Sequence, residues 1–277
     1  MPKVAKQTMK SNRSKLSKPG ELASAWDMAD TMSLLLYGRS GTGKTTLWAT
    51  FPKPILVLVC SGGNRPGELK SIDTPENRKS VKPLVIQRSK DVLDCLIQPS
   101  FDYQTVVLDH ASGMQDLVLK EILGLDEIPA GKSWGLATQQ QYGQCTLQCK
   151  ELFRSILNLQ CHRVIVAQER EFNTDTDGEL LLPYVGAALM PSLVGWLNPA
   201  CDYIVQTFIR QKEVEVQTKL GTQVVKTRKK TREVEYCVRT GPHEIFQTKF
   251  RIPKGQKMPE VIVDASFQKI QKLVKGG

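Results

Sequence analysis

This chain of 277 residues lacks the long apolar runs of a membrane protein, because no stretch approaches the roughly 20 residues that cross a bilayer. The N-terminus is basic and has no apolar centre, so we expect no secretory signal. The seven cysteines include no CxxC pair. Cys145, Cys149, Cys161 and His162 leave a zinc set open beside the alternative of ordinary buried thiols. These absences favour a protein of a reducing cytoplasm.

Acidic residues are scarce relative to basic ones. The net charge is +10 and the isoelectric point is near 9.2, which indicates a polyanionic partner, usually nucleic acid. The imbalance is strongest in residues 1–20, with six Lys or Arg and no acid. We interpret residues 1–22 as a disordered basic arm, which either touches nucleic acid or only aids solubility.

Short apolar runs alternate with helical stretches from about residue 33. The runs cover residues 33–38, 54–60, 83–87, 105–110 and 163–169. Strands buried on both faces have this composition, so we predict an α/β fold whose mostly parallel sheet is covered by helices. The longest helical stretches are 111–125 and 138–159. Residues 23–277 would form one core.

The pattern changes after residue 210 to alternating polar and apolar residues, which is typical of half-exposed antiparallel strands. We predict a protruding β-hairpin over 211–239 and a strand and helix within 243–275. The hairpin contains the densest basic cluster of the chain, and we expect this cluster to contact the DNA backbone or to be a solvated tip. Its members are Lys226, Arg228, Lys229, Lys230 and Arg232.

The segment "GRSGTGKT" matches the phosphate-binding pattern G-x-x-x-x-G-K-[ST], with an apolar strand before it and a helix-forming stretch after it. Its glycines let backbone N–H groups converge on phosphate oxygens at a helix N-terminus. Lys44 would reach the β- and γ-phosphates, and the Thr45 hydroxyl would hold Mg²⁺. The predicted nucleotide-binding residues are Gly38, Arg39, Ser40, Gly41, Thr42, Gly43, Lys44, Thr45 and Thr46.

A carboxylate should complete the magnesium site. Asp109 ends the buried run 105–110, as the second conserved motif of P-loop enzymes requires, although an aspartate there could instead cap the following helix. The general base that activates water is less defined. No acid stands directly after the run 54–60, and Glu68, which comes several residues later, is either the base or only a surface residue of a short helix.

These motifs and their order resemble the RecA/RadA/KaiC superfamily, and most closely its small phage nucleotide-binding members, over residues 33–275. The resemblance implies that Gln168, which ends a buried strand, senses the γ-phosphate; satisfying backbone groups is the alternative. Lys249 and Arg251, which would share one face of a late strand, would reach the nucleotide of a neighbouring subunit. The alternative for this pair is a solvated face, with Phe250 and Ile252 turned to the core.

By the same resemblance, residues 126–140 and 169–187 stand where the superfamily has mobile DNA-binding loops. In the first of them, Lys132 and Trp134 would contact single-stranded DNA, with Trp134 stacking on a base or packing structurally.

The sequence therefore predicts an ATP- and Mg²⁺-dependent ATPase that binds single-stranded DNA in phage recombination, by annealing or strand exchange, in the host cytoplasm. It would assemble into homo-oligomeric rings or filaments, with a single-strand DNA-binding protein as a further candidate partner. Two alternatives stay open. One is a nucleotide-switched loader that hydrolyses slowly, and the other is a helicase-like DNA motor.

Overall fold

A computed structural model describes residues 31–60, 67–97, 101–125, 137–172, 175–176, 179–180, 183–220 and 223–276. Glu68, residues 175–176 and 179–180, and residues 215–220 and 223–229 are described by their backbone only. The predicted basic arm 1–22, Lys132 and Trp134 lie outside the described residues. The predictions made for them therefore stay predictions.

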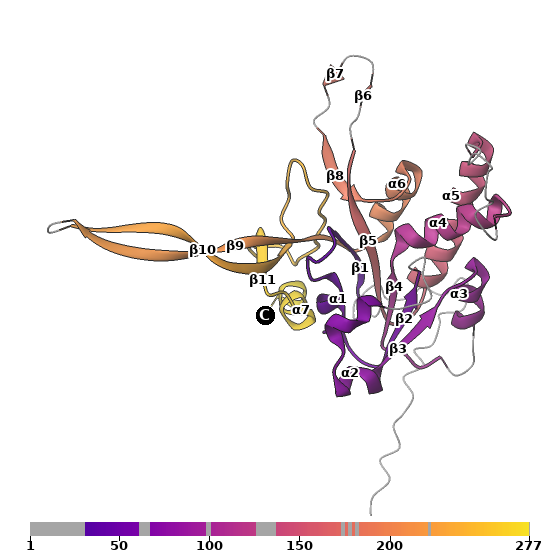
Figure 1. Cartoon of the computed structure of the whole chain (residues 1–277), viewed down its shortest axis with the longest axis horizontal. Helices are drawn as coiled ribbons and strands as arrows, with labels where there is room; N and C mark the ends of the chain where they lie inside the picture. Colours follow the sequence, from indigo (N-terminus) through magenta and orange to yellow (C-terminus); the bar gives the residue numbers. More distant parts are fainter. Residues whose placement is uncertain are drawn as a thin grey trace, which may run out of the picture.

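One nine-stranded sheet organises the molecule, in the order β11-β10-β9-β1-β5-β4-β2-β3 with β8 paired to β5 (Figure 1). Its parallel strands are β1 (Ser33–Gly38), β2 (Ile55–Val59), β3 (Val81–Val85), β4 (Thr105–Asp109), β5 (His162–Phe172) and β9 (Tyr203–Leu220). The antiparallel strands are β8 (Tyr184–Ala187), β10 (Gln223–Arg239) and β11 (Val261–Val263). The predicted fold class, a mostly parallel sheet with an antiparallel extension, is confirmed.

Helices cover both faces of this sheet because alternate residues of each strand point to opposite sides. In β1, Leu35 and Tyr37 join one core cluster, and Leu34 and Leu36 join the other. The first cluster packs against α3 (Ser89–Leu96), α4 (Ala111–Ile122), α5 (Gln139–Leu157) and α6 (Pro191–Ala200). The second packs against α1 (Lys44–Trp48), the 3₁₀-helix η1 (Gly67–Ile72) and α7 (Phe267–Lys275). The short α2 (Pro75–Ser80) precedes β3.

Local capping explains where the two predicted long helices begin. Thr138 accepts a hydrogen bond from the backbone N–H of Gln141, and the Gln141 side chain reciprocates, which is a capping box at the start of α5. His110 caps α4 in the same position by accepting from the Gly113 N–H. Among the described residues, no helix is both long and apolar enough to cross a membrane.

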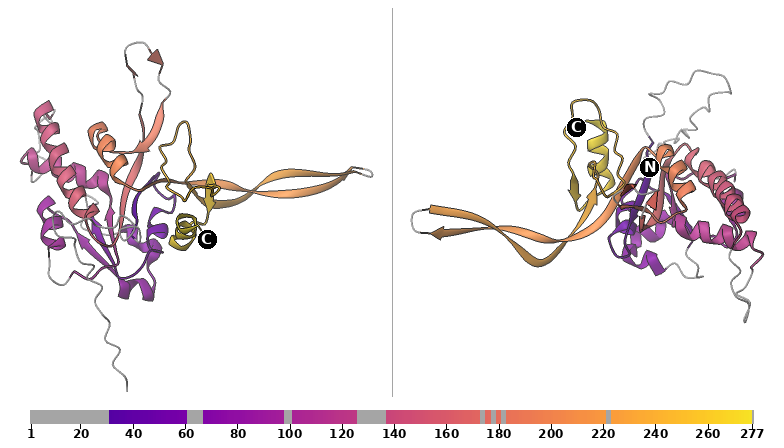
Figure 2. Two further views of the ribbon diagram at one scale, coloured as in Figure 1. Left: turned by 180° about the vertical axis from the view of Figure 1, so that it is seen from behind. Right: turned by 90° about the horizontal axis from the view of Figure 1, so that it is seen from above.

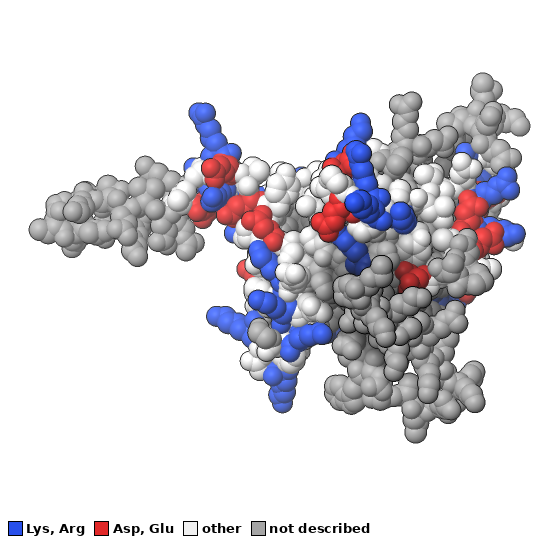
Figure 3. Space-filling view, turned by 90° about the horizontal axis from the view of Figure 1, so that it is seen from below, with Lys and Arg blue, Asp and Glu red and all other residues white. Residues whose placement is uncertain are grey.

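The predicted hairpin is present and longer than expected. Strand β9 runs without a break from the buried Tyr203 to Leu220, and it pairs with β10 from Gln206↔Arg239 to Leu220↔Gln223. Beyond the body of the sheet they form a two-stranded ribbon (Figures 1 and 2). From here on, the arm means this ribbon and not the predicted basic segment 1–22. Acidic and basic side chains are mixed at its base (Figure 3), where Arg210 pairs with Glu235 and Lys212 with Glu233.

Two local predictions are wrong. Residues 169–187 were expected to be a mobile loop, but β5 continues to Phe172 and pairs with β8, so this segment begins and ends as a β-hairpin. Its outer part contains the two-residue strands β6 (Asp175–Thr176) and β7 (Glu179–Leu180). The late strand expected around Lys249 is also absent, because residues 246–252 form only two isolated bridges. Within 243–275, regular structure is limited to β11 and α7.

Candidate functional site

The candidate site lies at the carboxyl ends of β1, β4 and β5, where α/β sheets usually bind ligands. Strand β5 stands between the strand that leads into "GRSGTGKT" and the strand that ends at Asp109. This order brings Lys44, Asp109 and Gln168 together, although they are far apart in the sequence. A cavity of about 320 Å³ lies there. It is lined by Ser40, Gly41, Gly43, Lys44, Thr45, Thr46, Ser71, Asp109, His110, Gln168 and Tyr236.

The P-loop, residues 38–45, has the backbone shape that a phosphate cradle needs. Gly41 and Gly43 have φ values of 78° and 87°, in the left-handed region that favours glycine. Gly43 is also the N-cap residue of α1 and has no side chain to satisfy the first N–H groups of that helix. Those groups and the positive end of the helix are therefore directed at the cavity, which fits a nucleotide phosphate.

Strand β9 fixes the P-loop from the side. A Cβ at Gly38 would lie 2.3 Å from Thr207 Oγ1 and 2.4 Å from Thr207 O, so only glycine allows this approach. The hydroxyls of Thr42 and Thr207 are 2.7 Å apart, and Thr42 Oγ1 also donates to Arg39 O at 2.7 Å. The side chain of Thr42 is thus structural, and its backbone alone is free to serve phosphate.

Lys44 and Asp109 face the same cavity from different elements. Lys44 Nζ donates to Gly38 O at 2.8 Å and to Arg39 O at 2.7 Å, which folds the ammonium back over the P-loop. Asp109 is buried and accepts from Trp48 Nε1 at 3.1 Å. The alternative that Asp109 caps α4 is excluded, since His110 is the cap.

The donor set fits Mg²⁺ bound together with a nucleotide. Thr45 and Asp109 line the same cavity, and hard oxygen ligands of this kind hold Mg²⁺ together with substrate phosphates and water. The open zinc alternative is not supported. Cys145 and Cys149 are buried with their sulfurs 4.0 Å apart, His162 Nδ1 accepts from Met32 N, and no cluster of three metal-type ligands occurs within the described residues.

Gln168 lies where the resemblance placed it. Val164, Val166 and Gln168 share the α1 side of β5, so the Gln168 amide faces the cavity. Its side chain forms no hydrogen bond with another described residue, so a role in satisfying backbone groups has no support in this part of the chain. Its role as a sensor remains a prediction.

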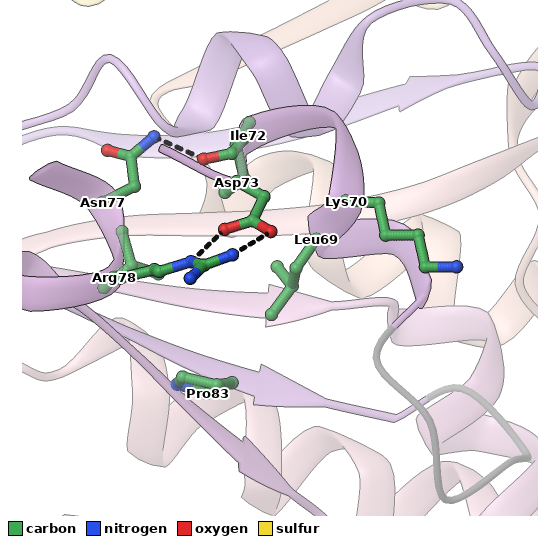
Figure 4. Close-up of a pocket in the computed structure, with 8 residues that line it drawn as sticks. Leu69, Lys70, Ile72, Asp73, Asn77, Arg78 and Pro83 are labelled. Atoms are coloured by element: carbon green, nitrogen blue, oxygen red, sulfur yellow. Dashed lines mark hydrogen bonds and ion pairs between the residues drawn. The ribbon is translucent and has the colours of Figure 1, made fainter. Parts of the chain in front are cut away.

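The 3₁₀-helix η1 contributes to two cavities. Ser71 lines the nucleotide cavity, while its neighbours Lys70 and Ile72 line a second one of about 330 Å³ under β3 (Figure 4). Position 68 lies in the same 3₁₀-helix, three residues before Ser71. The predicted base therefore belongs to an element that borders the site.

Lys249 and Arg251 lie away from the cavity of their own chain. Lys249 Nζ donates to the carbonyls of Asn198, Pro199 and Cys201 at the end of α6, and burial and the neighbouring Arg251 lower its pKa. Arg251 pairs with Asp202 at 2.9 Å. Phe250 turns away from this pair even without the strand and packs against Tyr203, with the ring centroids 4.9 Å apart. Ile252, which was expected to turn to the core as well, is half-buried and belongs to neither core cluster.

Two features of the site were missed by sequence reasoning. Tyr236 of β10 borders the cavity, and its ring carbon Cδ1 would be 3.2 Å from a Cβ at Gly43. No motif marks it, because only the return of the arm to the sheet brings it there.

The second missed feature is a polar chain on the opposite side of the sheet. Arg39 Nε donates to Glu169 at 3.1 Å, Gln206 Nε2 donates to Glu169 at 2.8 Å, and Arg239 Nε donates to Gln206 at 3.2 Å. This chain joins the P-loop to the base of the arm.

The cavity is surrounded by the P-loop, the buried Asp109 and the polar side chain of Gln168. This combination defines the class of P-loop ATPases. A family described as an AAA domain matches residues 30–252, which is most of the chain, so the chain belongs to that family.

A comparison with curated protein sequences found no match. Among solved structures, the chain is similar to the flagellar accessory protein FlaH of Methanocaldococcus jannaschii, at 8% identity and a TM-score of 0.41. That alignment covers 84% of this chain and 85% of FlaH. It is also similar to the KaiC-like protein PH0186 of Pyrococcus horikoshii OT3, at 11% identity and a TM-score of 0.37, over 74% and 84% of the two chains.

Proposed function

We propose that this chain is a phage recombination ATPase that hydrolyses ATP with Mg²⁺, assembles into rings or filaments, and uses its nucleotide state to control single-stranded DNA binding. One observation carries the proposal. Strand β10 contains both Tyr236, which borders the nucleotide cavity, and the basic cluster of the arm. A single strand thus joins the two sites that such a protein must couple.

Hydrolysis would depend on positioning and charge rather than on covalent chemistry. The N–H groups of the P-loop and the Lys44 ammonium would bind the phosphates and stabilise negative charge as it develops on transfer. Mg²⁺, held through Thr45 and Asp109, would neutralise the same charge. Glu68, on the element that borders the cavity, is the candidate to orient and deprotonate the attacking water.

DNA binding is assigned to the outer part of the arm. Lys226, Arg228 and Lys230 alternate along β10, so these positions share one face of the ribbon. Lys230 and Arg232 are exposed. Although Glu213 and Glu215 stand opposite Lys230 and Arg228 on β9, residues 216–232 contain six Lys or Arg and no acid. This excess of positive charge suits a phosphate backbone and would bind it without sequence preference.

The resemblance adds a contribution from a second subunit. Lys249 and Arg251 do not line the cavity of their own chain, as expected of groups that serve a neighbour's nucleotide. Their contacts with α6 and Asp202 would then hold the two cations at the surface where the neighbour binds.

A second candidate is a nucleotide-switched loader with slow hydrolysis. It is favoured by the cavity lining, in which Asp109 is the only carboxylate among the described side chains.

The ATP hydrolysis rate, with and without single-stranded DNA at two protein concentrations and alongside Lys44→Ala, separates these candidates. The recombination ATPase predicts a rate that rises with DNA and more than linearly with protein. A slow rate that ignores both would favour the loader.

A further inference from the structure

Exposed apolar side chains of the described residues gather in two places. Nine large apolar side chains of the described residues are exposed. Four of them lie on the arm and four on or beside α3 and α5, so the exposed apolar surface is concentrated in two clusters. The arm members are Ile209, Val214, Val234 and Tyr236, and the others are Leu93, Ile97, Tyr142 and Leu147. Clustered exposure of this kind marks interaction sites more often than scattered exposure does.

The first cluster extends the hydrophobic core of the α1 side beyond the helices that cover it. Val205 and Val238 belong to the core on the α1 side, and Ile209 and Tyr236 follow on the same faces of β9 and β10. Ile209 lies directly opposite Tyr236, and Val234 lies two residues further out. We call Ile209, Val234 and Tyr236 the arm patch. They are 51%, 52% and 47% exposed, so the described residues do not cover them.

Two members of the second cluster, Leu93 and Leu147, line a groove of about 470 Å³ between α3, α4 and α5. Leu93, Ile122, Leu147 and Leu152 supply its apolar wall, and Leu147 is 66% exposed. We call this the helical groove. Its charged lining consists of Glu121, Glu151 and Lys90, and Glu151 already pairs with Arg154.

The two surfaces lie on different sides of the molecule: the arm patch is at the base of the arm, beside the nucleotide cavity, and the helical groove lies among the helices on the side away from the arm (Figures 1 and 2). The arm points away from the body on one side, and α3 and α5 form the other end, in each of the three views (Figures 1 and 2). One copy therefore cannot cover its own arm patch with its own groove. A second copy can, and such a contact between two different surfaces is heterologous, which generates rings or filaments.

Charge and stability both favour this occupant. Near the arm patch, Arg210 and Lys212 are paired with Glu235 and Glu233, and the exposed Lys230 and Arg232 stand close to Val234 along β10. The groove offers these two cations the carboxylate of Glu121, which accepts hydrogen bonds from Ser89 and forms no ion pair with a described residue. A two-stranded ribbon alone is only marginally stable in water, and β10, with 17 residues, extends about 55 Å. Burial of its apolar base would stabilise it.

We propose that the arm patch of one copy docks in the helical groove of the next, as the head-to-tail contact of the assembly. The inference rests on the homo-oligomer of the proposed function and names its interface. Because Tyr236 belongs both to the arm patch and to the lining of the nucleotide cavity, the docked neighbour would stand at the rim of that cavity. Assembly would then depend on the bound nucleotide, while Lys226, Arg228 and Lys229, further out on the arm, stay available to DNA.

The test uses the full chain with Val234→Glu on the arm patch, Leu147→Glu in the helical groove, and Ile245→Glu as a matched control. All three side chains are exposed, and Ile245 belongs to neither surface. Particle mass is measured by sedimentation with Mg²⁺, a non-hydrolysable ATP analogue and a single-stranded oligonucleotide. We expect each interface variant to weaken association at least tenfold, and Ile245→Glu to assemble as the wild type does.

Mixing the two interface variants distinguishes the arrangements. Val234→Glu keeps an intact groove and Leu147→Glu keeps an intact arm patch, so the mixture should form pairs and stop there. Normal assembly by Leu147→Glu would overturn the proposal in favour of a symmetric arm-to-arm contact. Loss of DNA binding by Val234→Glu with assembly intact would overturn it in favour of DNA on the patch. A wild-type chain that stays monomeric under every condition would instead refute the assembly in the proposed function.

Discussion

The inner and outer parts of β9 and β10 belong to the same two strands and have opposite environments. Inside the sheet, Val205, Thr207 and Val238 are buried, and Thr207 holds the P-loop in place. Outside it, most of the described side chains, at residues 209–214 of β9 and 230–236 of β10, are exposed. The same two strands form both parts. Whether other elements pack over a part therefore decides if it becomes a site for a small ligand or a surface for large partners.

The two parts are also stabilised differently. Around the cavity, Thr42, Lys44 and Asp109 are each held by buried or partly buried hydrogen bonds. The described part of the arm has the strand ladder and two exposed ion pairs, and such pairs contribute about 0–1 kcal/mol. We therefore expect substitutions in the cavity to change chemistry, and substitutions on the arm to change association.

The largest effect should come from Lys44→Ala, which removes the phosphate-binding ammonium from the cavity and leaves the arm unchanged. Losing the ammonium that serves the phosphates should lower the hydrolysis rate about 1000-fold, measured as phosphate release at saturating ATP. Lys53→Ala is the control, since Lys53 pairs with Glu76 away from the cavity. Equal loss in both variants would contradict the assignment.

The next effect should come from removing Arg251, which tests whether the cavity is completed by a neighbour. Arg251→Ala should lower hydrolysis about 100-fold. Asp202→Asn breaks the same ion pair but keeps the cation, so it should have little effect. A mixture of Arg251→Ala with Lys44→Ala should regain activity, because one variant supplies the nucleotide site and the other the cation. If Asp202→Asn is equally impaired and the mixture stays inactive, Arg251 is only structural.

The arm itself should respond in DNA binding rather than in hydrolysis. Neutralising Lys226, Arg228, Lys229, Lys230 and Arg232 together should weaken single-stranded DNA binding about tenfold or more at low salt. The salt dependence of the affinity should also become shallower, by about 0.7 per lost phosphate contact. Fluorescence anisotropy at several salt concentrations measures both. An unchanged slope would assign the arm to the interface between copies alone.

The contrast between cavity and arm also separates what the sequence could predict from what it could not. The P-loop and Asp109 follow from local patterns, because strand, glycines and helix are contiguous. Tyr236 and Glu169 could not be found this way, since their roles depend on strand order and on the path of the arm. The opposite orientation of Lys249 and Phe250 was predicted correctly while their strand was not, because the Lys249 ammonium binds the end of α6 and its backbone forms only one bridge to β9.

A smaller effect should follow from Trp48→Phe inside the cavity. Trp48 Nε1 donates to Asp109 Oδ2, and its removal leaves a buried carboxylate with one donor fewer. The change should cost about 1–3 kcal/mol of unfolding free energy, and hydrolysis should fall about tenfold as Asp109 loses its orientation. Chemical denaturation and phosphate release measure the two. Extra Mg²⁺ should restore part of the rate if only orientation is lost, and it should restore none if Asp109 serves the fold alone.

The smallest expected effect concerns Tyr236, and it is the most informative about the boundary between the nucleotide cavity and the arm. Its ring borders the cavity beside Gly43 and is half exposed on the arm patch. Tyr236→Phe keeps the aromatic face, whereas Tyr236→Ala removes it, so only the second should weaken nucleotide binding, by about threefold to tenfold. Titration of a fluorescent ATP analogue measures the affinity, and sedimentation of the same samples measures assembly. If the ring joins the two parts, Tyr236→Ala must weaken both nucleotide binding and assembly. A loss of assembly with unchanged nucleotide affinity would make Tyr236 a residue of the arm alone, with the cavity complete without it.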